Sequence, residues 1–190
     1  TNLVSQNSIN YNVKVDKHSF DATALFEHQK NKNDYLGGYG EGIAADGLNY
    51  LDVVSKNKSV EGNYVDWTNI SYLGLFNYGY DSRYIVDATY RREGSSKFAE
   101  NFRFGDFWSV GAAWNIYKEA FMEGSVFNNL KLRGSYGTSC NSGINENQYQ
   151  RLLGFSASYD SQPVLYPSGV GNGALTWEKN KTADVGFEFG

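Results

Sequence analysis

Few residues of this chain have the type and spacing that catalysis or metal binding requires. The two histidines, His18 and His28, lie too far apart for a helical metal pair, and neither stands in a CxxC or HExxH pattern. The single cysteine, Cys140, lies in a segment rich in Gly, Ser and Asn and permits no internal disulfide bond. No G-x-S-x-G pattern is present. We therefore predict no catalytic residue, no metal site and no cofactor, and we do not expect an enzyme.

One glycine-rich stretch superficially resembles a phosphate-binding loop, since it contains Gly38-x-Gly40-x-Gly42. Such a loop requires a buried strand before it and an amphipathic helix after it, and the flanking sequence has neither. The chain also carries a net charge of −4 and no basic cluster. Nucleotide binding and nucleic-acid binding are therefore not expected.

Four charged residues stand together near the end of a predicted strand: Asp87, Arg91, Arg92 and Glu93. In an enzyme they could form an acid/base cluster. We favour the alternative, in which they line a polar lumen or the base of a loop and pair with one another across strands.

Aromatic residues are also frequent between the predicted strands. Their faces could stack on sugar rings, or they could pack loops together or belong to an outer aromatic girdle. The candidate substrate-binding residues are Tyr35, Tyr39, Tyr64, Phe102 and Phe104.

The elements that would position these residues are strands, because apolar and polar residues alternate with a period of two. Residues 67–117 predict a strand, a tight turn at 81–83, a second strand, a loop at 93–105 and a third strand. One face of the first strand carries Tyr72, Phe76 and Tyr78, and the other carries Asn69, Ser71 and Asn77. Further strands are predicted at 8–16, 19–29, 130–136 and 177–189.

Between these strands we expect long connections. Residues 30–66 are polar and Gly-rich and predict a loop, with a short helix or turn near 47–55. Residues 118–129 predict a short helical or irregular connection. Residues 137–175 predict a loop in which 148–159 could pair locally.

An apolar face opposite a polar face suits either a soluble sandwich or a membrane barrel. Two features favour the barrel. Tyr78, Tyr80 and Tyr84 crowd one short turn, as in an interfacial aromatic girdle, and short turns alternate with long loops. A mean hydropathy of −0.53 is compatible with a barrel, whose lumen and loops are polar. No stretch approaches the roughly 20 apolar residues of a transmembrane helix.

Composition supports mostly β structure in a single domain, because aromatic residues reach 16% of the 190 residues and Gly is frequent. The N-terminus lacks the basic and apolar regions of a signal peptide. We expect that a signal peptide was removed or that the chain begins inside a larger protein. The C-terminus stops within a strand pattern, which is typical of a fragment.

Several sequence blocks occur in a recognisable order: YIVDATYRREGSSKFAENFRFGDFWSVGAAWNI, EAFM, NLKLRGSYGTSCNSGI and LTWEKNKTADVGFEF. From about residue 67 to 190 this order resembles the SusC/RagA family of TonB-dependent outer-membrane importers of Bacteroidetes. Three positions depart from the family pattern. Glu93 stands where Asp is usual, Trp108 replaces Pro, and Ser139-Cys140-Asn141 replaces Thr-Gly-Asn.

The resemblance implies an all-β fold, in which residues 1–190 are a partial antiparallel transmembrane β-barrel with long extracellular loops. About seven strands of a 22-stranded barrel would be present, without the plug domain, the signal peptide and the remaining strands. Residues 93–105 and 137–175 would be extracellular, whereas 81–83 and 118–129 would face the periplasm. The strand at 148–159 would then stay within the extracellular excursion.

The resemblance also implies energy-coupled nutrient import across the Gram-negative outer membrane, with glycans or peptides as cargo. Its partners would be a SusD-like surface lipoprotein, outer-membrane lipid, and TonB-ExbB-ExbD acting through the plug domain. The alternative is a secreted carbohydrate-binding β-sandwich module, which requires that these residues fold alone as a closed, water-soluble domain.

Overall fold

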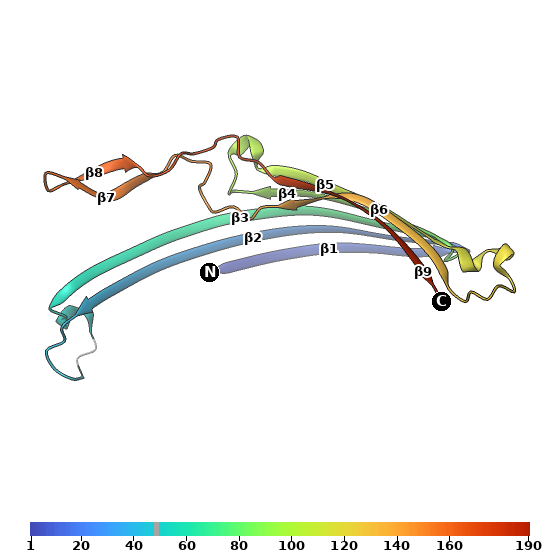
Figure 1. The fold of residues 1–190 in the computed structure, drawn as a ribbon, viewed down its shortest axis with the longest axis horizontal. Helices are drawn as coiled ribbons and strands as arrows, with labels where there is room; N and C mark the ends of the chain where they lie inside the picture. Colours follow the sequence, from blue (N-terminus) through green and yellow to red (C-terminus); the bar gives the residue numbers. More distant parts are fainter. Residues whose placement is uncertain (48–49) are drawn as a thin grey trace.

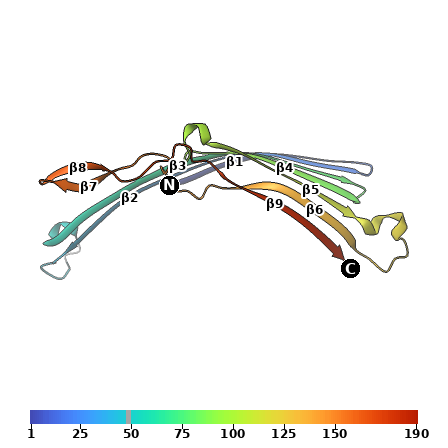
Figure 2. The same cartoon turned by 45° about the horizontal axis from the view of Figure 1, so that its top comes forward.

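A computed structural model describes residues 1–47 and 50–190 of the chain. Its main body is one antiparallel, arched sheet with the strand order β1-β2-β3-β4-β5-β6-β9 (Figures 1 and 2). The remaining two strands, β7 and β8, pair only with each other. The strands are β1 Asn2–Val15, β2 His18–Glu41, β3 Lys56–Tyr80, β4 Tyr84–Ser95, β5 Phe104–Asn115, β6 Leu130–Asn141, β7 Leu153–Tyr159, β8 Gln162–Pro167 and β9 Glu178–Phe189.

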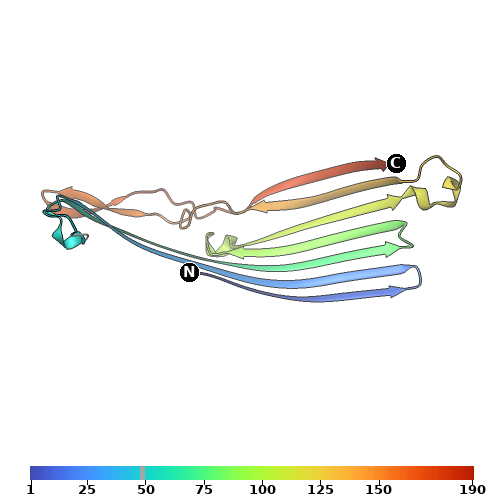
Figure 3. The ribbon, with the colours of Figure 1, turned by 90° about the horizontal axis from the view of Figure 1, so that it is seen from below.

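The predicted tight turn joins β3 to β4. Asp81 and Ser82 have φ values of 53° and 50°, and the Arg83 amide donates to the Tyr80 carbonyl at 2.8 Å. A two-residue turn with both central residues in the left-handed region matches the twist of the flanking strands. The β1–β2 and β3–β4 turns lie at one end of the sheet together with the β5–β6 connection, whereas the β2–β3 ribbon and the connection that holds β7 and β8 extend from the opposite end (Figure 3).

The strand register keeps like residues on the same face. Tyr78 of β3 lies opposite Phe20 of β2 and Val86 of β4. The preceding residue, Asn77, lies opposite Asp21 and Asp87. Since alternate side chains point to opposite faces, one face of the sheet is apolar and the other polar, as the sequence predicts.

Rings gather on the apolar face beside the short turns. The ring centroids of Tyr80 and Tyr84 lie 6.4 Å apart, and those of Tyr84 and Trp114 lie 6.3 Å apart. His18 lies 5.0 Å from Tyr80 on the other side. The crowding predicted from Tyr78, Tyr80 and Tyr84 is therefore confirmed, and it extends across four strands.

Glu119 connects β4, β5 and the turn before β4 at the same end of the sheet. It lies between two short 3-10 helices, η3 Ile116–Lys118 and η4 Ala120–Met122, which confirm the predicted irregular connection. Its carboxylate accepts hydrogen bonds from the Tyr84 hydroxyl at 2.6 Å and the Trp114 indole at 2.9 Å. It also forms an ion pair with Arg83 at 3.1 Å. The Tyr84 and Trp114 hydrogen bonds hold the pKa of Glu119 below its ordinary value.

The prediction of a loop over residues 30–66 is wrong. β2 continues to Glu41 and β3 begins at Lys56, so these residues form most of a long two-stranded ribbon. The ribbon lacks alternation of apolar and polar residues because both of its faces are exposed. Its end carries a 3-10 turn, η1 Leu51–Val53, within the range predicted as 47–55; residues 48–49 of that range lie outside the described residues.

The loop at 93–105 is shorter than predicted, because β4 extends to Ser95 and β5 begins at Phe104. Between them lies η2 Glu100–Phe102. The long connection also begins later than predicted, at the end of β6. Local pairing within it is confirmed, since β7 pairs with β8. In the part of the chain that the structure describes, no helix has the length and apolar character needed to cross a membrane.

We predict that Glu119→Gln loosens the connection between β5 and β6, because an uncharged amide cannot pair with Arg83. In the wild type, the depressed pKa means that the stabilisation is complete above the ordinary carboxyl pKa. It is lost as pH falls through the lowered pKa of Glu119. The difference in tryptophan fluorescence between wild type and Glu119→Gln, followed against pH, measures this transition.

The matched control is Glu123→Gln, which removes an exposed carboxylate from the same connection. It should leave the fluorescence titration unchanged. A transition at or above the ordinary glutamate pKa would contradict the proposed tie.

Candidate functional site

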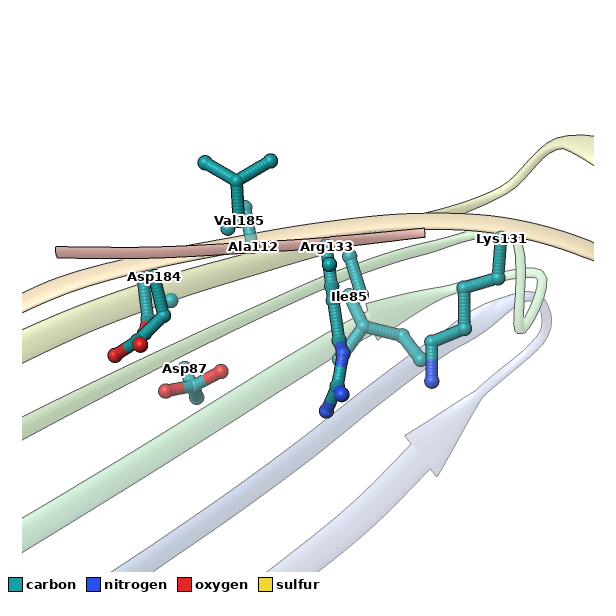
Figure 4. Close-up of a pocket in the computed structure, with 12 residues that line it drawn as sticks. Ile85, Asp87, Ala112, Lys131, Arg133, Asp184 and Val185 are labelled. Atoms are coloured by element: carbon teal, nitrogen blue, oxygen red, sulfur yellow. The ribbon is translucent and has the colours of Figure 1, made fainter. Parts of the chain in front are cut away.

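The polar face of β4, β5, β6 and β9 is hollowed into a shallow trough of about 570 Å³. Figure 4 shows its charged side chains pointing to one side of the sheet while Val185 points to the other. These charged residues are Asp87, Lys131, Arg133 and Asp184.

Two glycines let charged side chains lie close to the floor of the trough. Gly111 lies opposite Asp87, and a Cβ at Gly111 would come within 2.6 Å of Asp87 Oδ1. Gly186 lies opposite Arg133, and a Cβ there would come within 2.6 Å of Arg133 Nε. A larger residue at either glycine would therefore displace the neighbouring charge.

The trough has the electrostatics of a solvated polar wall. Arg133 pairs with Glu188 at 3.4 Å, and both side chains are largely exposed. The side chains of Asp87, Lys131 and Asp184 make no hydrogen bond or ion pair with any other described residue. Within the described residues, no group of three or more His, Cys, Asp or Glu side chains could hold a metal ion. The arrangement can contact a polar solute, but it lacks a paired nucleophile and base.

The charged residues near the end of β4 pair differently from the prediction. Arg91 pairs with Glu93 along the same strand at 2.9 Å, and its Nε donates to Ser71 Oγ at 2.9 Å. Arg92 pairs across strands with Asp106 at 3.2 Å. The prediction that the four residues pair with one another across strands is therefore wrong. Arg91 and Glu93 are two residues apart on one strand, so their side chains lie on the same face and pair there.

The candidate aromatic residues lie mostly in strands, not in loops. Tyr35 and Tyr39 are in β2, Tyr64 is in β3, and Phe104 begins β5, which leaves only Phe102, in η2, between strands. The assignment to loops is wrong because the strand ribbon is longer than the pattern suggests.

These five residues also fail to form one cluster. Tyr35 and Tyr39 have the same parity in β2 and share a face of the ribbon, with the Tyr35 hydroxyl donating to Glu61 at 3.3 Å. Tyr64 lies opposite Asp34 and so occupies the other face, with the Lys32 ammonium 5.2 Å from its ring centroid. Phe104 and Phe102 lie beyond β4, and the Arg92 guanidinium stands 5.1 Å from the Phe104 ring.

At the outer end of the ribbon, Glu41 accepts hydrogen bonds from the Tyr39 hydroxyl and from Asn57 at 2.6 Å. These bonds, the tyrosine's first, lower the pKa of Glu41. The carboxylate therefore stays ionised beside the tyrosine ring at neutral pH, and this face of the ribbon combines an aromatic surface with hydrogen-bond acceptors.

Sequence reasoning missed the best-buried cluster of the described chain, which lies where the long connections begin. Phe98, Phe107 and Trp177 pack together, and Phe98 is fully buried. The Trp177 ring centroid lies 4.7 Å from Phe98 and 5.7 Å from Phe107. Its indole also donates to the Arg103 carbonyl at 3.1 Å. The sequence did contain a signal for this cluster, since Phe98 and Trp177 stand in two of the blocks that resemble the family.

Lys97, next to Phe98, links the loop after β4 to the chain that follows β6. Its ammonium donates to the Ile144 carbonyl at 3.2 Å, pairs with Glu146 at 3.4 Å and lies 5.1 Å from the Trp67 ring centroid. The loop after β4 is therefore attached to the chain that leaves β6 and to the residue that precedes β9. We call Lys97, Phe98, Phe107 and Trp177 the rim cluster.

An open, arched antiparallel sheet with one apolar and one polar face is a segment of a β-barrel wall. A family model described as "TonB dependent receptor-like, beta-barrel" matches residues 2–190. The chain therefore belongs to the TonB-dependent receptor β-barrel family, which agrees with the resemblance drawn from the sequence blocks.

Curated relatives have the same family name. TonB-dependent receptor P3 of Formosa agariphila is 32% identical over 99% of this chain and 19% of its own length. TonB-dependent receptor SusC of Bacteroides thetaiotaomicron is 33% identical over 65% of this chain and 13% of its own length. The chain thus spans about a fifth of the first of these relatives.

Solved structures match over the whole chain. The RagAB peptide importer in its closed-closed state superimposes with a TM-score of 0.90 at 28% identity, covering 100% of this chain and 21% of the other. The same importer in its open-open state gives a TM-score of 0.83 over 98% of this chain. The sheet described here therefore has the backbone shape of the matching segment of that importer.

We predict that Phe98→Ala opens the rim cluster, because truncating a fully buried Phe typically costs about 3–5 kcal/mol. Hydrogen exchange of the full-length protein should accelerate together in residues 96–103 and 142–147, while 84–92 keep their protection. Phe102→Ala, which truncates an exposed ring in the same loop, is the matched control. Acceleration in only one of the two segments would show that the rim cluster does not join them.

Proposed function

We propose that the full-length protein is a TonB-dependent nutrient importer of the Gram-negative outer membrane and that residues 1–190 form part of its multi-pass barrel wall. The observation that carries this proposal is the family match over residues 2–190 together with the two-faced sheet. The apolar face meets outer-membrane lipid, and the polar face lines the lumen. The segment performs no chemistry.

The two ends of the sheet have different roles in this proposal. The aromatic residues beside the short turns lie at the periplasmic interface, where such rings concentrate. The ribbon, the rim cluster and β7–β8 project from the opposite, extracellular end. Cargo enters there and passes the polar wall on which the trough lies.

The cargo is a glycan or a peptide, and the partner that closes the barrel from outside is a SusD-like surface lipoprotein. Energy comes from TonB-ExbB-ExbD acting on a plug domain elsewhere in the polypeptide. The likeness to the RagAB peptide importer supports a two-component assembly and a peptide cargo. The exposed rings of Tyr35 and Tyr39, with Glu61 and Glu41 beside them, support sugar contact as well.

A secreted sandwich module has no comparable support. Its fold requires a second sheet packed over the apolar face. In the described part of the chain the second sheet is the β7–β8 pair, two strands that pair with no strand of the main sheet and are too short to cover it. We therefore do not propose this function.

The full-length protein should fractionate with the outer membrane and require detergent for extraction. Uptake of its cargo should stop when TonB is deleted or when the inner-membrane proton gradient is collapsed. Deletion of a gene for an unrelated periplasmic binding protein serves as the control. Recovery of the full-length protein as a water-soluble secreted species would overturn the proposal.

The aromatic candidates make a separate prediction. Replacing both Tyr35 and Tyr39 with Ala should weaken cargo binding roughly thirtyfold, at about 1 kcal/mol for each lost ring contact. Cargo affinity of the detergent-solubilised protein, measured by calorimetry, is the readout. Replacing Leu36 with Ala, which removes an exposed side chain from the opposite face of the ribbon, provides the control. Equal losses for both faces would contradict a cargo surface on the Tyr35 face.

A further inference from the structure

The β2–β3 ribbon has a free edge. β1 and the residue before it pair with β2 only as far as Lys32, and β4 pairs with β3 only from Asn69 onward. Beyond these points β2 and β3 continue together, paired only with each other, as the two longest arrows in Figure 3 show. At about 3.3 Å per residue, the unpaired part of β3 is roughly 40 Å long.

The backbone groups that face this edge can be assigned. The Thr68 carbonyl accepts from the Ser96 amide at 2.9 Å, and the Thr68 amide donates to Ser96 Oγ at 2.9 Å. Both backbone groups of Thr68 therefore point toward the side on which β4 lies. Because direction alternates along a strand and the register with β2 is regular from Ser59 onward, the even-numbered residues of β3 share this direction. Within the regular part they are Val60, Gly62, Tyr64 and Asp66.

The edge of β2 that faces β1 leads to the same assignment of backbone directions. The Lys32 amide donates to the Thr1 carbonyl at 2.7 Å, so Lys32 faces β1 and not β3. Its opposite residue on β3 is Asp66, which must likewise face away from β2. The bonds that hold the ribbon together therefore come from odd-numbered residues such as Glu61 and Asn63.

No strand among the described residues covers this edge. The nearest connection, the loop after β4, is held toward β6 and β9 by the rim cluster. Residues 56–64 are all exposed. The stretch contains no proline and no bulge from Ser59 onward, two devices by which proteins commonly block a free edge.

We propose that the free edge of β3, from Lys58 to Asp66, binds an extended peptide by strand addition. This inference rests on the proposed function and deepens it, since it assigns a peptide cargo to a site on the extracellular ribbon. The edge offers amide donors and carbonyl acceptors that repeat every second residue, about 6.8 Å apart. A peptide backbone matches this repeat, whereas a glycan has no regular series of amide groups.

Charge gives the bound peptide a direction. Lys56 and Lys58 stand at the outer end of β3, and neither side-chain ammonium makes a hydrogen bond or ion pair with another described residue. Asp66 stands at the inner end, where its carboxylate accepts from the Tyr64 hydroxyl at 3.3 Å. The peptide ammonium lies near Asp66 and its carboxylate near Lys58, so the peptide runs antiparallel to β3.

Side chains of β3 add contacts to the bound peptide without requiring one particular peptide sequence. Val60 and Tyr64 lie on one face of the ribbon and are 80% and 54% exposed. Alternate side chains of the added strand would lie beside them, while the remaining ones lie beside Glu61 and Asn63. Affinity then comes mainly from the backbone.

The test uses the full-length protein in detergent and an octapeptide of Ser, Val and Thr with free termini, with binding measured by calorimetry. Two N-methylated forms carry methyl groups on alternate residues, in opposite phase. One phase should weaken binding roughly tenfold or more, because it removes the hydrogen bonds to β3, while the other keeps most of the affinity. Acetylating and amidating the termini should weaken binding as well. Equal binding of both N-methylated forms would overturn the proposal.

Val60→Pro tests the protein side, because it removes an edge-facing amide without breaking the β2–β3 ladder. It should abolish octapeptide binding, whereas Val60→Ala, which keeps the amide, should bind within about threefold of wild type. Continued hydrogen-exchange protection of Ser59 and Glu61 amides shows that the ribbon is intact. Unchanged binding by Val60→Pro with an intact ribbon would refute the site.

Hydrogen exchange identifies competing occupants. The Val60, Gly62 and Tyr64 amides should exchange fast without peptide and slowly with it. Protection without peptide would mean that another segment, a partner protein or a second copy covers the edge, and the inference would then be wrong. Outer-membrane fractionation and TonB-dependent uptake of a glycan would survive that outcome, so failure of this inference is distinguishable from failure of the proposed function.

Discussion

The pairing of backbone amides and carbonyls is the constraint on which the rest of this structure depends. In hydrocarbon each unpaired group costs several kcal/mol, so a strand that crosses a membrane must be paired along both edges. β2, β3, β4, β5 and β6 meet this requirement over the stretch between the short turns and the rim cluster. Past that stretch β2 and β3 continue alone, and the edge of β3 that faces away from β2 is free.

The same ladder fixes the division between the two faces. Because side chains alternate, Val86 and Asp87 occupy opposite faces although they are neighbours in sequence. The apolar face needs no further partner in lipid, and the polar face carries charges that water can solvate. This accounts for a sheet whose described residues include few fully buried side chains, with those few concentrated in the rim cluster. At the rim cluster, side-chain packing and not strand pairing determines how the loops leave the sheet.

Much of this architecture could be predicted from the sequence, and the parts that failed have a common physical cause. Strands with one lipid-facing side have a strict apolar repeat, which made the wall segments and the tight turn at Asp81 recognisable. The β2–β3 ribbon has no such repeat because neither of its faces is covered, so residues 30–66 resembled a loop. The candidate aromatic residues were misplaced for the same reason. The rim cluster was missed because its members come from three separate segments, and only the fold brings Phe98 to Trp177.

Accessibility of single cysteines on β4 tests the central claim, that this sheet is the wall of a transmembrane barrel, most directly. In a Cys140→Ser background, cysteines introduced one at a time at Val86, Asp87, Ala88 and Thr89 can be labelled in intact outer membranes. The account predicts that a water-soluble maleimide modifies the cysteines at Asp87 and Thr89, and that a lipid-soluble one modifies those at Val86 and Ala88. Equal reaction of all four positions with the water-soluble reagent would contradict it.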